Sequence, residues 1–422
     1  MGRSRSISWW MNHLSRIHPA TMALGLDRVG EVYHRLGGQP PAPKVITVAG
    51  TNGKGSSCAI LTAILRAGGK RVGTFTSPHL FRFNERIAID GEPVDDRRLI
   101  DALEVVEQAR GEIELTYFEY AALAAFVCFE QAGVDAAVLE VGLGGRLDAV
   151  NVVDPDLALI TNIGFDHMRW LGDTLDLIAA EKAGIFRPGR PAVCAQADAP
   201  AGLHEAAHRV GVKWRVAGRD FDHQLTDRGW SWNHGGRRLA DLPRPALPGD
   251  HQLVNASGCL AALAGVGLLP AKQMVAKGLT QARVAGRLWR VAEAPDVVLD
   301  VGHNPAAAGV LRRWLESTPC DGESWLVLGM LRDKAPQDFV AELAPWINRF
   351  VFCGLPGRRG QSARQLRGKV RVPQLKARLA DDPGAALDWV LPRLRPADRL
   401  LLAGSFVTVE LAARHLGLAA GS

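Results

Sequence analysis

Residues 45–57 read VITVAGTNGKGSS, an apolar strand that runs into a glycine-rich turn with one lysine and two hydroxyls. The stretch from Cys58 to Leu65 then has the composition of a helix. Backbone N–H groups of such a turn, with the positive end of the helix that follows, form a binding site for anions. We therefore predict a phosphate-binding loop in which Lys54 reaches terminal phosphates and Ser56 or Ser57 faces Mg²⁺.

The spacing in this loop departs from the common P-loop pattern. Gly50 and Gly53 are only three positions apart, and Gly55 separates the lysine from the first hydroxyl. The alternative is a glycine-rich loop that binds nothing. The order of strand, lysine, hydroxyls and helix favours the phosphate site.

Short apolar runs alternate with helical stretches from about residue 44 to 194, which predicts a mostly parallel sheet covered by helices on both faces. The predicted strands are Val45–Ala49, Arg71–Thr76, Ala136–Glu140, Leu157–Asn162 and Ala192–Cys194. The predicted helices are Ser57–Ala67, Arg97–Arg110, Phe118–Ala132 and Leu175–Gly184. Tryptophans among Gly, Asp and Asn over 212–247 then predict short antiparallel strands, followed by helices over 255–268 and 271–279.

A second alternating set predicts a smaller, Rossmann-like α/β domain. Its strands are expected at Val297–Asp300, Trp325–Gly329, Phe350–Cys353 and Leu400–Ala403, and its helices at Ala306–Leu315, Gln337–Ala344, Ala385–Val390 and the C-terminus. The segment bracketed by Gly286 and Pro295 is expected to be the linker. A chain of 422 residues is too long for one ordinary domain, and we expect one domain over 1–288 and another over 289–422.

Composition narrows the class of protein. A net charge of +6 with 47% apolar residues is ordinary for a globular protein, and no basic run is interleaved with aromatics as a nucleic-acid groove requires. The six cysteines show no metal-ligand spacing and predict reduced core thiols. Neither a signal peptide nor a membrane span is evident. We expect a cytoplasmic protein without nucleic-acid or membrane partners.

Polar side chains follow the predicted strands, and ligands of open α/β sheets bind beyond the carboxyl ends of strands. Ser77 follows the second strand, Glu140 ends a strand that is apolar throughout, and His167 comes shortly after another. Glu140 resembles the acid that holds Mg²⁺ beside a P-loop. The alternatives are a surface acid for Glu140, a turn residue for Ser77 and an ordinary histidine for His167.

Lys182 lies among small and apolar residues in the run Ala179–Phe186. Such a lysine usually snorkels to water or pairs with an acid. Burial would favour its neutral form. A neutral amine reacts with CO₂ to give a carbamate, which is an anion that binds metal ions.

Together these stretches resemble the folylpolyglutamate synthases of the Mur ligase superfamily, and among them the bacterial bifunctional members. The matching runs are AGTNGKGS (49–56), SPHL (77–80), TYFEY (116–120), LEVGLGGRLD (139–148), EKAGIF (181–186), LDVGHNP (299–305) and GSF (404–406). The resemblance extends over essentially the whole chain. It implies ATP-dependent ligation of L-glutamate to dihydropteroate and to the γ-carboxylate of tetrahydrofolates, through an acyl phosphate.

The resemblance also implies a set of site residues, of which Lys54, His167 and Lys182 serve catalysis. Those for ATP are Thr51, Asn52, Gly53, Lys54, Gly55, Ser56, Asn255, Arg287, Asp300 and His303. Those for Mg²⁺, with two ions expected, are Ser77, Glu140, His167 and a carbamylated Lys182. Those for the pterin substrate are Met22, Ala23, Leu24, Gly25, Thr116, Tyr117, Phe118, Glu119, Leu147, Asp148 and Ala149. A monomer is expected.

The sequence departs from the family pattern at two places. Val150 stands where the family commonly has Thr or another residue before Asn, and Met168-Arg169 stands where we expect a small polar residue and an acid. They leave the reaction unchanged and bear on substrate preference. A peptidoglycan-type Mur ligase is the first alternative, but only 49 residues precede Gly50, fewer than a further domain needs. A nucleotide-binding module without catalysis is the second, but the residues expected for catalysis are all present: Lys54, Glu140, His167 and Lys182.

Overall fold

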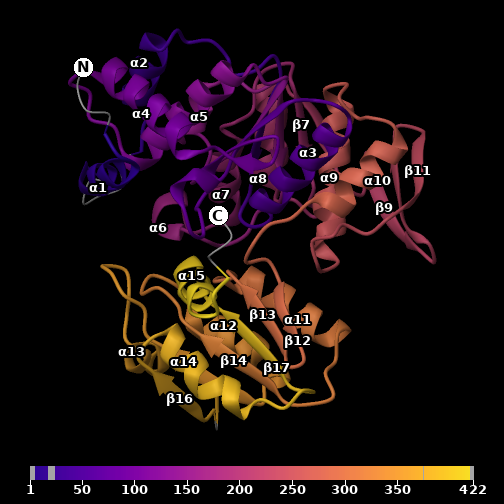
Figure 1. Ribbon diagram of the computed structural model, residues 1–422. Helices are drawn as coiled ribbons and strands as arrows, with labels where there is room; N and C mark the ends of the chain where they lie inside the picture. Colours follow the sequence, from indigo (N-terminus) through magenta and orange to yellow (C-terminus); the bar gives the residue numbers. More distant parts are fainter. Residues whose placement is uncertain (1–4, 18–23, 374, 419–422) are drawn as a thin grey trace. The chain divides into compact units, whose positions relative to one another are not determined.

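The computed structural model describes residues 5–17, 24–373 and 375–418. The chain divides into two compact units (Figure 1). The first comprises Met1–Ala246 and Gln252–Arg283, and the second comprises Leu247–His251 and Val284–Ser422. Residues 247–251 therefore group with the second unit although they lie far in sequence from its main body.

An eight-stranded sheet forms the centre of the first unit. In chain order its strands are β1 (Val45–Ala49), β2 (Val72–Phe75), β3 (Ile87–Ile89), β4 (Glu92–Pro93), β5 (Ala136–Glu140), β6 (Leu157–Ile160), β7 (Pro191–Cys194) and β8 (Lys213–Val216). They lie in the order β4-β3-β2-β5-β1-β6-β7-β8, and the antiparallel pairs are β2 with β3 and β3 with β4. The mostly parallel sheet predicted from the alternation is confirmed.

Helices cover both faces of this sheet. They are α1 (Ile7–Ile17), α2 (Asp27–Arg35), α3 (Lys54–Ala67), α4 (Asp96–Arg110), α5 (Tyr117–Ala132), α6 (Met168–Leu171), α7 (Leu175–Ala183), α8 (Ala201–Val210), α9 (His251–Gly265) and α10 (Lys272–Gln281), with the 3-10 turns η1 (Phe83–Arg86) and η2 (Ala149–Val152). The connection through α3 runs from β1 toward β2, whereas those through α7 and α8 run the opposite way along the sheet. Because parallel crossovers are right-handed, this reversal puts α3 on the face opposite α7 and α8.

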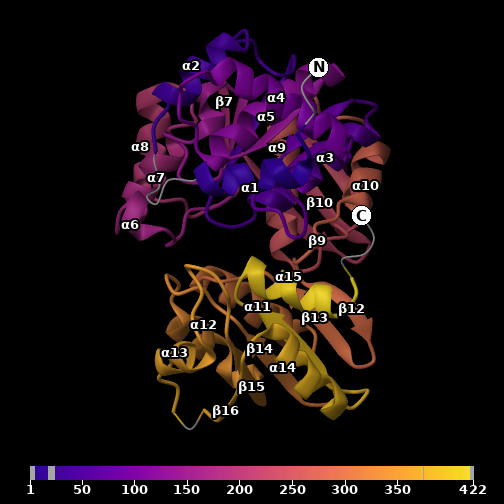
Figure 2. The same ribbon diagram turned by 60° about the vertical axis from the view of Figure 1, so that its left-hand side comes forward.

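A separate antiparallel sheet consists of β9 (Phe221–Thr226), β10 (Gly229–His234) and β11 (Arg237–Leu242). The antiparallel strands predicted from the tryptophan-rich composition are confirmed, and Trp230 and Trp232 of β10 are fully buried. Helix α10 packs on both α3 and β11, which attaches this sheet to the unit (Figure 2). One part of the prediction is wrong, because residues 213–216 form β8 and pair parallel with β7 in the large sheet.

The second unit holds a six-stranded sheet in the order β12-β13-β17-β14-β15-β16. Its strands are β12 (Trp289–Glu293), β13 (Asp296–Asp300), β14 (Ser324–Leu328), β15 (Arg349–Cys353), β16 (Ala377–Ala380) and β17 (Arg399–Ala403). Its helices are α11 (Pro305–Ser317), α12 (Pro336–Leu343), α13 (Ala363–Gly368), α14 (Pro383–Val390) and α15 (Phe406–His415), with 3-10 turns η3 (Ala344–Trp346) and η4 (Leu391–Arg393). The predicted linker is wrong, because that segment forms β12, which pairs antiparallel with β13.

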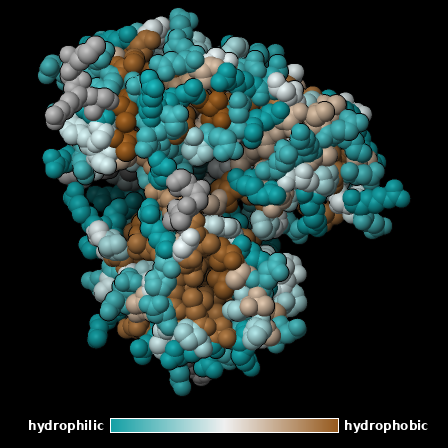
Figure 3. Space-filling model, in the orientation of Figure 1, coloured by the Kyte–Doolittle hydropathy of each residue, from teal (hydrophilic) through white to brown (hydrophobic). Residues whose placement is uncertain are grey.

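The distribution of apolar side chains follows these layers. Strands β1, β5 and β17 are buried along their whole length, as strands covered on both faces must be. Polar side chains dominate the visible face of the first unit, while apolar colour gathers on one face of the second (Figure 3). No helix in the described part of the chain is long and apolar enough to cross a membrane.

Candidate active site

The phosphate loop lies where β1 ends, at the point from which connections leave in opposite directions along the sheet. Gly53 has φ +83°, and a Cβ there would lie 2.7 Å from Asn255 Oδ1, so both backbone conformation and space require glycine. Helix α3 starts at Lys54, and the first N–H groups of a helix have no partner within it. Lys54 Nζ donates to the carbonyls of Gly50 at 3.0 Å and Thr51 at 3.2 Å.

Residues after β6 hold this loop in place. Asn162 Oδ1 accepts from the backbone N–H groups of Thr51 at 3.2 Å and Asn52 at 2.9 Å. Thr51 Oγ1 donates to the Gly164 carbonyl and accepts from the Gly164 N–H. The sequence indicated that Asn162 ends a strand but did not indicate this role, and these N–H groups of Thr51 and Asn52 are therefore engaged within the protein.

Helix α9 covers the loop with two amide side chains. Asn255 Nδ2 donates to Gln252 Oε1 at 2.9 Å, and Gln252 Nε2 donates to Ser56 Oγ at 3.4 Å. Asn255 thus lies at the phosphate loop, beside Gly53. Gln252 was missed in the sequence, although its place one helical turn before Asn255 was an available signal.

Ser77 and Glu140 meet at the same edge of the sheet. The Ser77 N–H donates to Glu140 Oε2 at 3.1 Å, and a Cβ on Gly55 would lie 3.7 Å from that oxygen, so the carboxylate faces the first turn of α3. Hydroxyl and carboxylate oxygens fit Mg²⁺, which nucleotide sites hold through one or two carboxylates plus phosphate oxygens and water. Within the described ranges no group of three His, Cys, Asp or Glu could hold a metal alone. These donors therefore suit an ion that substrate phosphates help to bind.

Lys182, in the last turn of α7, is 4% exposed and donates from Nζ to the Gly50 carbonyl at 3.0 Å. The same carbonyl accepts from Lys54, so the two amines converge on one oxygen. Burial and then the charge of Lys54 lower the pKa of Lys182 to about 7, against the opposing effects of Asp166 and Asp148. A substantial fraction of this amine is therefore neutral near pH 7.

His167 precedes α6 with φ 52°, and its exposed ring has Nε2 at 3.9 Å from Asp166 Oδ1. The backbone N–H of His167 also donates to Asp166 Oδ1 at 2.8 Å. Asp166 acts electrostatically on Lys182, which brings the Asp166-His167 pair into the neighbourhood of the buried amine.

The segment Thr116–Glu119, predicted to line the site of the pterin substrate (the acceptor of glutamate), forms the N-cap and first turn of α5. Thr116 and Glu119 form a capping box, and Glu119 also accepts from Arg28 Nη2 at 3.1 Å. Glu119 is 4% exposed, so it joins α2 to α5. Tyr117 packs on Phe83 with ring centroids 5.4 Å apart, and Phe118 lies against Phe75 at 5.6 Å.

The glycine run after β5 packs against both α5 and α7. A Cβ on Gly142 would lie 2.6 Å from the Phe118 ring, and one on Gly145 would lie 2.8 Å from the Glu181 carbonyl. Asp148 organises this loop, because its carboxylate accepts from the N–H groups of Leu143 at 2.8 Å and Val150 at 3.1 Å. Burial raises the pKa of Asp148 to about 7.

The other residues predicted for the acceptor site vary in exposure. Leu147 is half-buried, Ala149 is buried and Leu24 is 36% exposed. Gly25 lies next to Leu24, while Met22 and Ala23 lie outside the described residues.

The second unit brings together Arg287, Asp300 and His303 at the end of β13. Asp300 accepts from the N–H groups of Leu288 at 2.8 Å and Gly302 at 2.7 Å, and burial raises its pKa. His303 Nδ1 donates to the Val301 carbonyl at 2.8 Å, because a carbonyl oxygen can only accept. The Arg287 guanidinium lies 5.5 Å from the ring centroid of Phe406.

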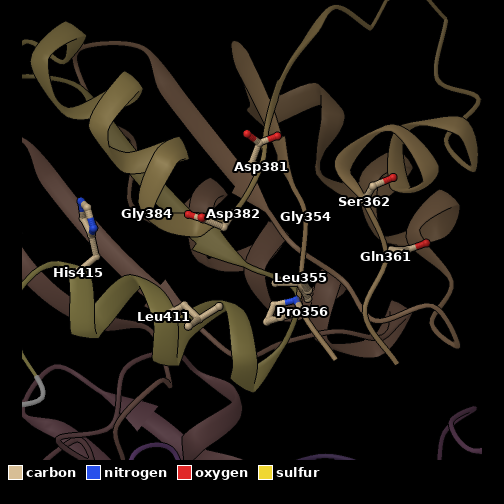
Figure 4. Close-up of a pocket in the computed structure, with 10 residues that line it drawn as sticks. All are labelled: Gly354, Leu355, Pro356, Gln361, Ser362, Asp381, Asp382, Gly384, Leu411 and His415. Carbon is tan, nitrogen blue, oxygen red and sulfur yellow. The ribbon is translucent and has the colours of Figure 1, made fainter. Parts of the chain in front are cut away.

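A cavity of about 660 Å³ lies elsewhere in the second unit, beyond the ends of β15 and β16 (Figure 4). Its lining is Gly354, Leu355, Pro356, Gln361, Ser362, Asp381, Asp382, Gly384, Leu411 and His415. None of the described site residues predicted from the sequence belongs to this lining, so it is separate from the candidate site.

A phosphate loop, a facing carboxylate and a buried lysine on a mostly parallel sheet, with a second α/β unit, define a Mur-type ligase. The family "Mur ligase middle domain" matches residues 48–263, and "Mur ligase, glutamate ligase domain" matches residues 286–406.

Comparison with similar proteins identifies the family within the Mur-type ligases. The dihydrofolate synthase/folylpolyglutamate synthase of Escherichia coli (strain K12) is 39% identical over 400 residues, covering 95% of this chain and 93% of the relative. The structure of E. coli FolC in complex with DHPP and ADP is 38% identical, with a TM-score of 0.92 and 98% of each chain covered. A bifunctional folylpolyglutamate synthase/dihydrofolate synthase with Mn, AMPPNP and L-glutamate bound has a TM-score of 0.91 at 39% identity, covering 98% of this chain and 99% of that one. The chain belongs to the dihydrofolate synthase/folylpolyglutamate synthase family.

Proposed function

We propose that this protein joins L-glutamate to dihydropteroate, forming dihydrofolate, and to the γ-carboxylate of tetrahydrofolates, forming folylpolyglutamates. ATP is cleaved to ADP and phosphate in each round. The observation that carries the proposal is the convergence of Lys54 and Lys182 on the Gly50 carbonyl, which sets a buried, partly neutral amine beside a phosphate loop.

The acceptor carboxylate is a poor electrophile and must be activated before an amine attacks it. In-line transfer of the γ-phosphoryl group gives an acyl phosphate, and this transfer depends on positioning and charge neutralisation. Lys54 and the N-terminus of α3 supply positive charge to the phosphates. Thr51–Ser56, Asn255, Arg287, Asp300 and His303 are the proposed nucleotide-binding residues.

The bound metal would be Mg²⁺, which supplies charge neutralisation and orientation to the phosphates. Ser77 and Glu140 would hold a first ion, and His167 with a carbamylated Lys182 would hold a second. The lowered pKa of Lys182 supports the carbamate, because CO₂ reacts with the neutral amine. The glutamate amine then attacks the acyl carbon, and fixed donors stabilise the oxyanion.

The acceptor would lie along Leu24–Gly25, Thr116–Glu119 and Leu147–Ala149, with Met22 and Ala23 as further candidates. Glu119 and Asp148 would act there by shaping the wall, since their carboxylates are hydrogen-bonded within the protein. Six free cysteines support a reducing compartment such as the cytoplasm. We expect the enzyme to act as a monomer, which light scattering of the purified protein checks.

The test is glutamate incorporation measured side by side with dihydropteroate and tetrahydrofolate. We expect both acceptors to be consumed with ADP release. Extension of tetrahydrofolate without consumption of dihydropteroate would rule out the first activity.

A further inference from the structure

Arg86 ends η1 and lies at the catalytic edge of the first sheet. Its carbonyl accepts from the Thr76 N–H at 2.9 Å, and the next N–H along, that of Ser77, donates to Glu140 Oε2. Its side chain reaches toward the start of α5, since the guanidinium carbon lies 5.2 Å from the Tyr117 ring centroid. Arg86 therefore lies between the proposed metal-binding acid and the proposed acceptor wall.

The Arg86 guanidinium is buried without a counter-ion. Arg86 is 7% exposed, and among the described residues no carboxylate lies within salt-bridge distance of it, although Glu140 and Glu85 act on it from farther away. Arginine stays charged, and a buried charge without a partner is costly. Nearby Arg82, which is exposed, has the usual arrangement and pairs with Asp96 at 2.6 Å.

Glu140 and Glu85 act on this charge electrostatically, but no neighbouring group in the described ranges forms a salt bridge with it. Arg86 Nε donates to His79 Nδ1 at 2.8 Å, and because a guanidinium has no acceptor, the His79 ring is neutral with its proton on Nε2. The Phe83 ring provides a cation–π contact, and Tyr117 provides a cation–π contact and a side-chain hydrogen bond, none of which carries a full negative charge. Glu85 is committed to the N–H groups of Leu80, Phe81 and Arg82, and Glu140 faces the phosphate loop.

We propose that Arg86 binds the reacting carboxylate of the acceptor acid, an inference that rests on the proposed function. The planar fork of a guanidinium matches a carboxylate with two parallel hydrogen bonds. Tyr117 and Phe83 orient the fork, and the His79 acceptor fixes its Nε edge. Arg86 is thus an acceptor-binding residue that selects an acid over an uncharged acceptor.

The test compares binding of dihydropteroate with binding of its carboxamide, in the wild type and in Arg86→Met. We expect the wild type to prefer the acid, and Arg86→Met to bind acid about 10- to 100-fold more weakly with the amide almost unaffected. The KM for ATP should stay within about 2-fold, since only the acceptor loses a partner. Arg82→Met, one turn away and exposed, is the matched control and should keep the preference.

A merely structural role of Arg86 would weaken binding of acid and amide alike. An unchanged acid-to-amide ratio in Arg86→Met would overturn the inference while leaving the proposed function intact. If Arg86→Met does not fold, Arg86→Lys provides the test, because lysine keeps the charge but lacks the planar fork. The preference for acid over amide must then fall several-fold in Arg86→Lys. A wild type without acceptor-dependent ADP release would instead overturn the proposed function, and this inference with it.

Discussion

The nucleotide side and the acceptor side of the first unit are built in different ways. The proposed nucleotide side centres on one continuous stretch, Gly50–Ser57, whose glycines and lysine are recognisable in the sequence, although Asn162 and Gln252 from other segments hydrogen-bond to it. The proposed acceptor side combines Leu24–Gly25, the start of α5 and the loop after β5, which are distant in sequence, and the glycine run of that loop packs against α7. A phosphate loop is therefore recognisable from local residues, whereas an acceptor wall depends on tertiary contacts.

Lys182 links the two sides. Its helix, α7, packs against the glycine run after β5, and its Nζ donates to the Gly50 carbonyl of the phosphate loop. The following substitutions separate the contributions of the two sides.

Lys54→Met should have the largest effect. It removes the cation that we assign to the terminal phosphates, and we expect the acceptor- and glutamate-dependent rate of ADP formation to fall by at least about 10²-fold. The exposed Lys70→Met is the control and should stay near wild type. Wild-type activity in Lys54→Met would contradict the proposed role of Lys54 in binding phosphate.

Lys182→Ala should lose most activity, roughly 10²-fold, because the carbamate and its proposed metal ligand disappear together. Short carboxylates such as formate or acetate should restore part of the rate in this variant, since the truncated side chain leaves them room. The same salts should not restore Lys54→Met. If Lys182→Ala turns over normally, the second metal site is wrong.

Gly145→Ala tests the acceptor side by packing alone. The new Cβ would lie 2.8 Å from the Glu181 carbonyl and 2.9 Å from that of Lys182. We expect a stability loss of about 1–3 kcal/mol in denaturant unfolding and a shift of α7 that lowers activity. Gly30→Ala in α2, where a Cβ meets nothing within 4 Å, should be neutral or stabilising. Equal effects of the two substitutions would contradict the close packing.

Asp148→Asn should have the smallest effect, visible in the pH dependence of stability. The folded-state pKa of about 7 lies above the unfolded value near 3.8, so the folded state binds more protons between these values. This group therefore contributes stability below about pH 4 that is lost as pH rises to about 7. The free energy of unfolding, measured across this pH range, should fall less steeply with rising pH in Asp148→Asn than in the wild type. Parallel slopes for the two proteins would refute the raised pKa.

Local patterns were enough to predict much of this molecule. Alternation predicted the two α/β sheets, because buried parallel strands are continuously apolar, and polar residues after the strands indicated Ser77 and Glu140. What could not be predicted depends on contacts between distant segments. Asn162, Gln252 and Arg86 owe their surroundings to packing across the sheet. The segment predicted as a linker became β12 because β13 offered it an edge to pair with. The boundary after residue 288 stays a prediction, as do the roles of the site residues.

The phosphate loop is hydrogen-bonded to the segment after β6. Thr51 and Gly164 form two hydrogen bonds with each other, and Asn162 Oδ1 accepts from the N–H of Asn52. These bonds continue the order of the sheet beyond the last residues of β1 and β6. The loop therefore loses its conformational entropy when the chain folds, and a ligand that enters later does not have to order it again. The entropic cost of shaping the proposed phosphate site therefore falls on folding and not on binding.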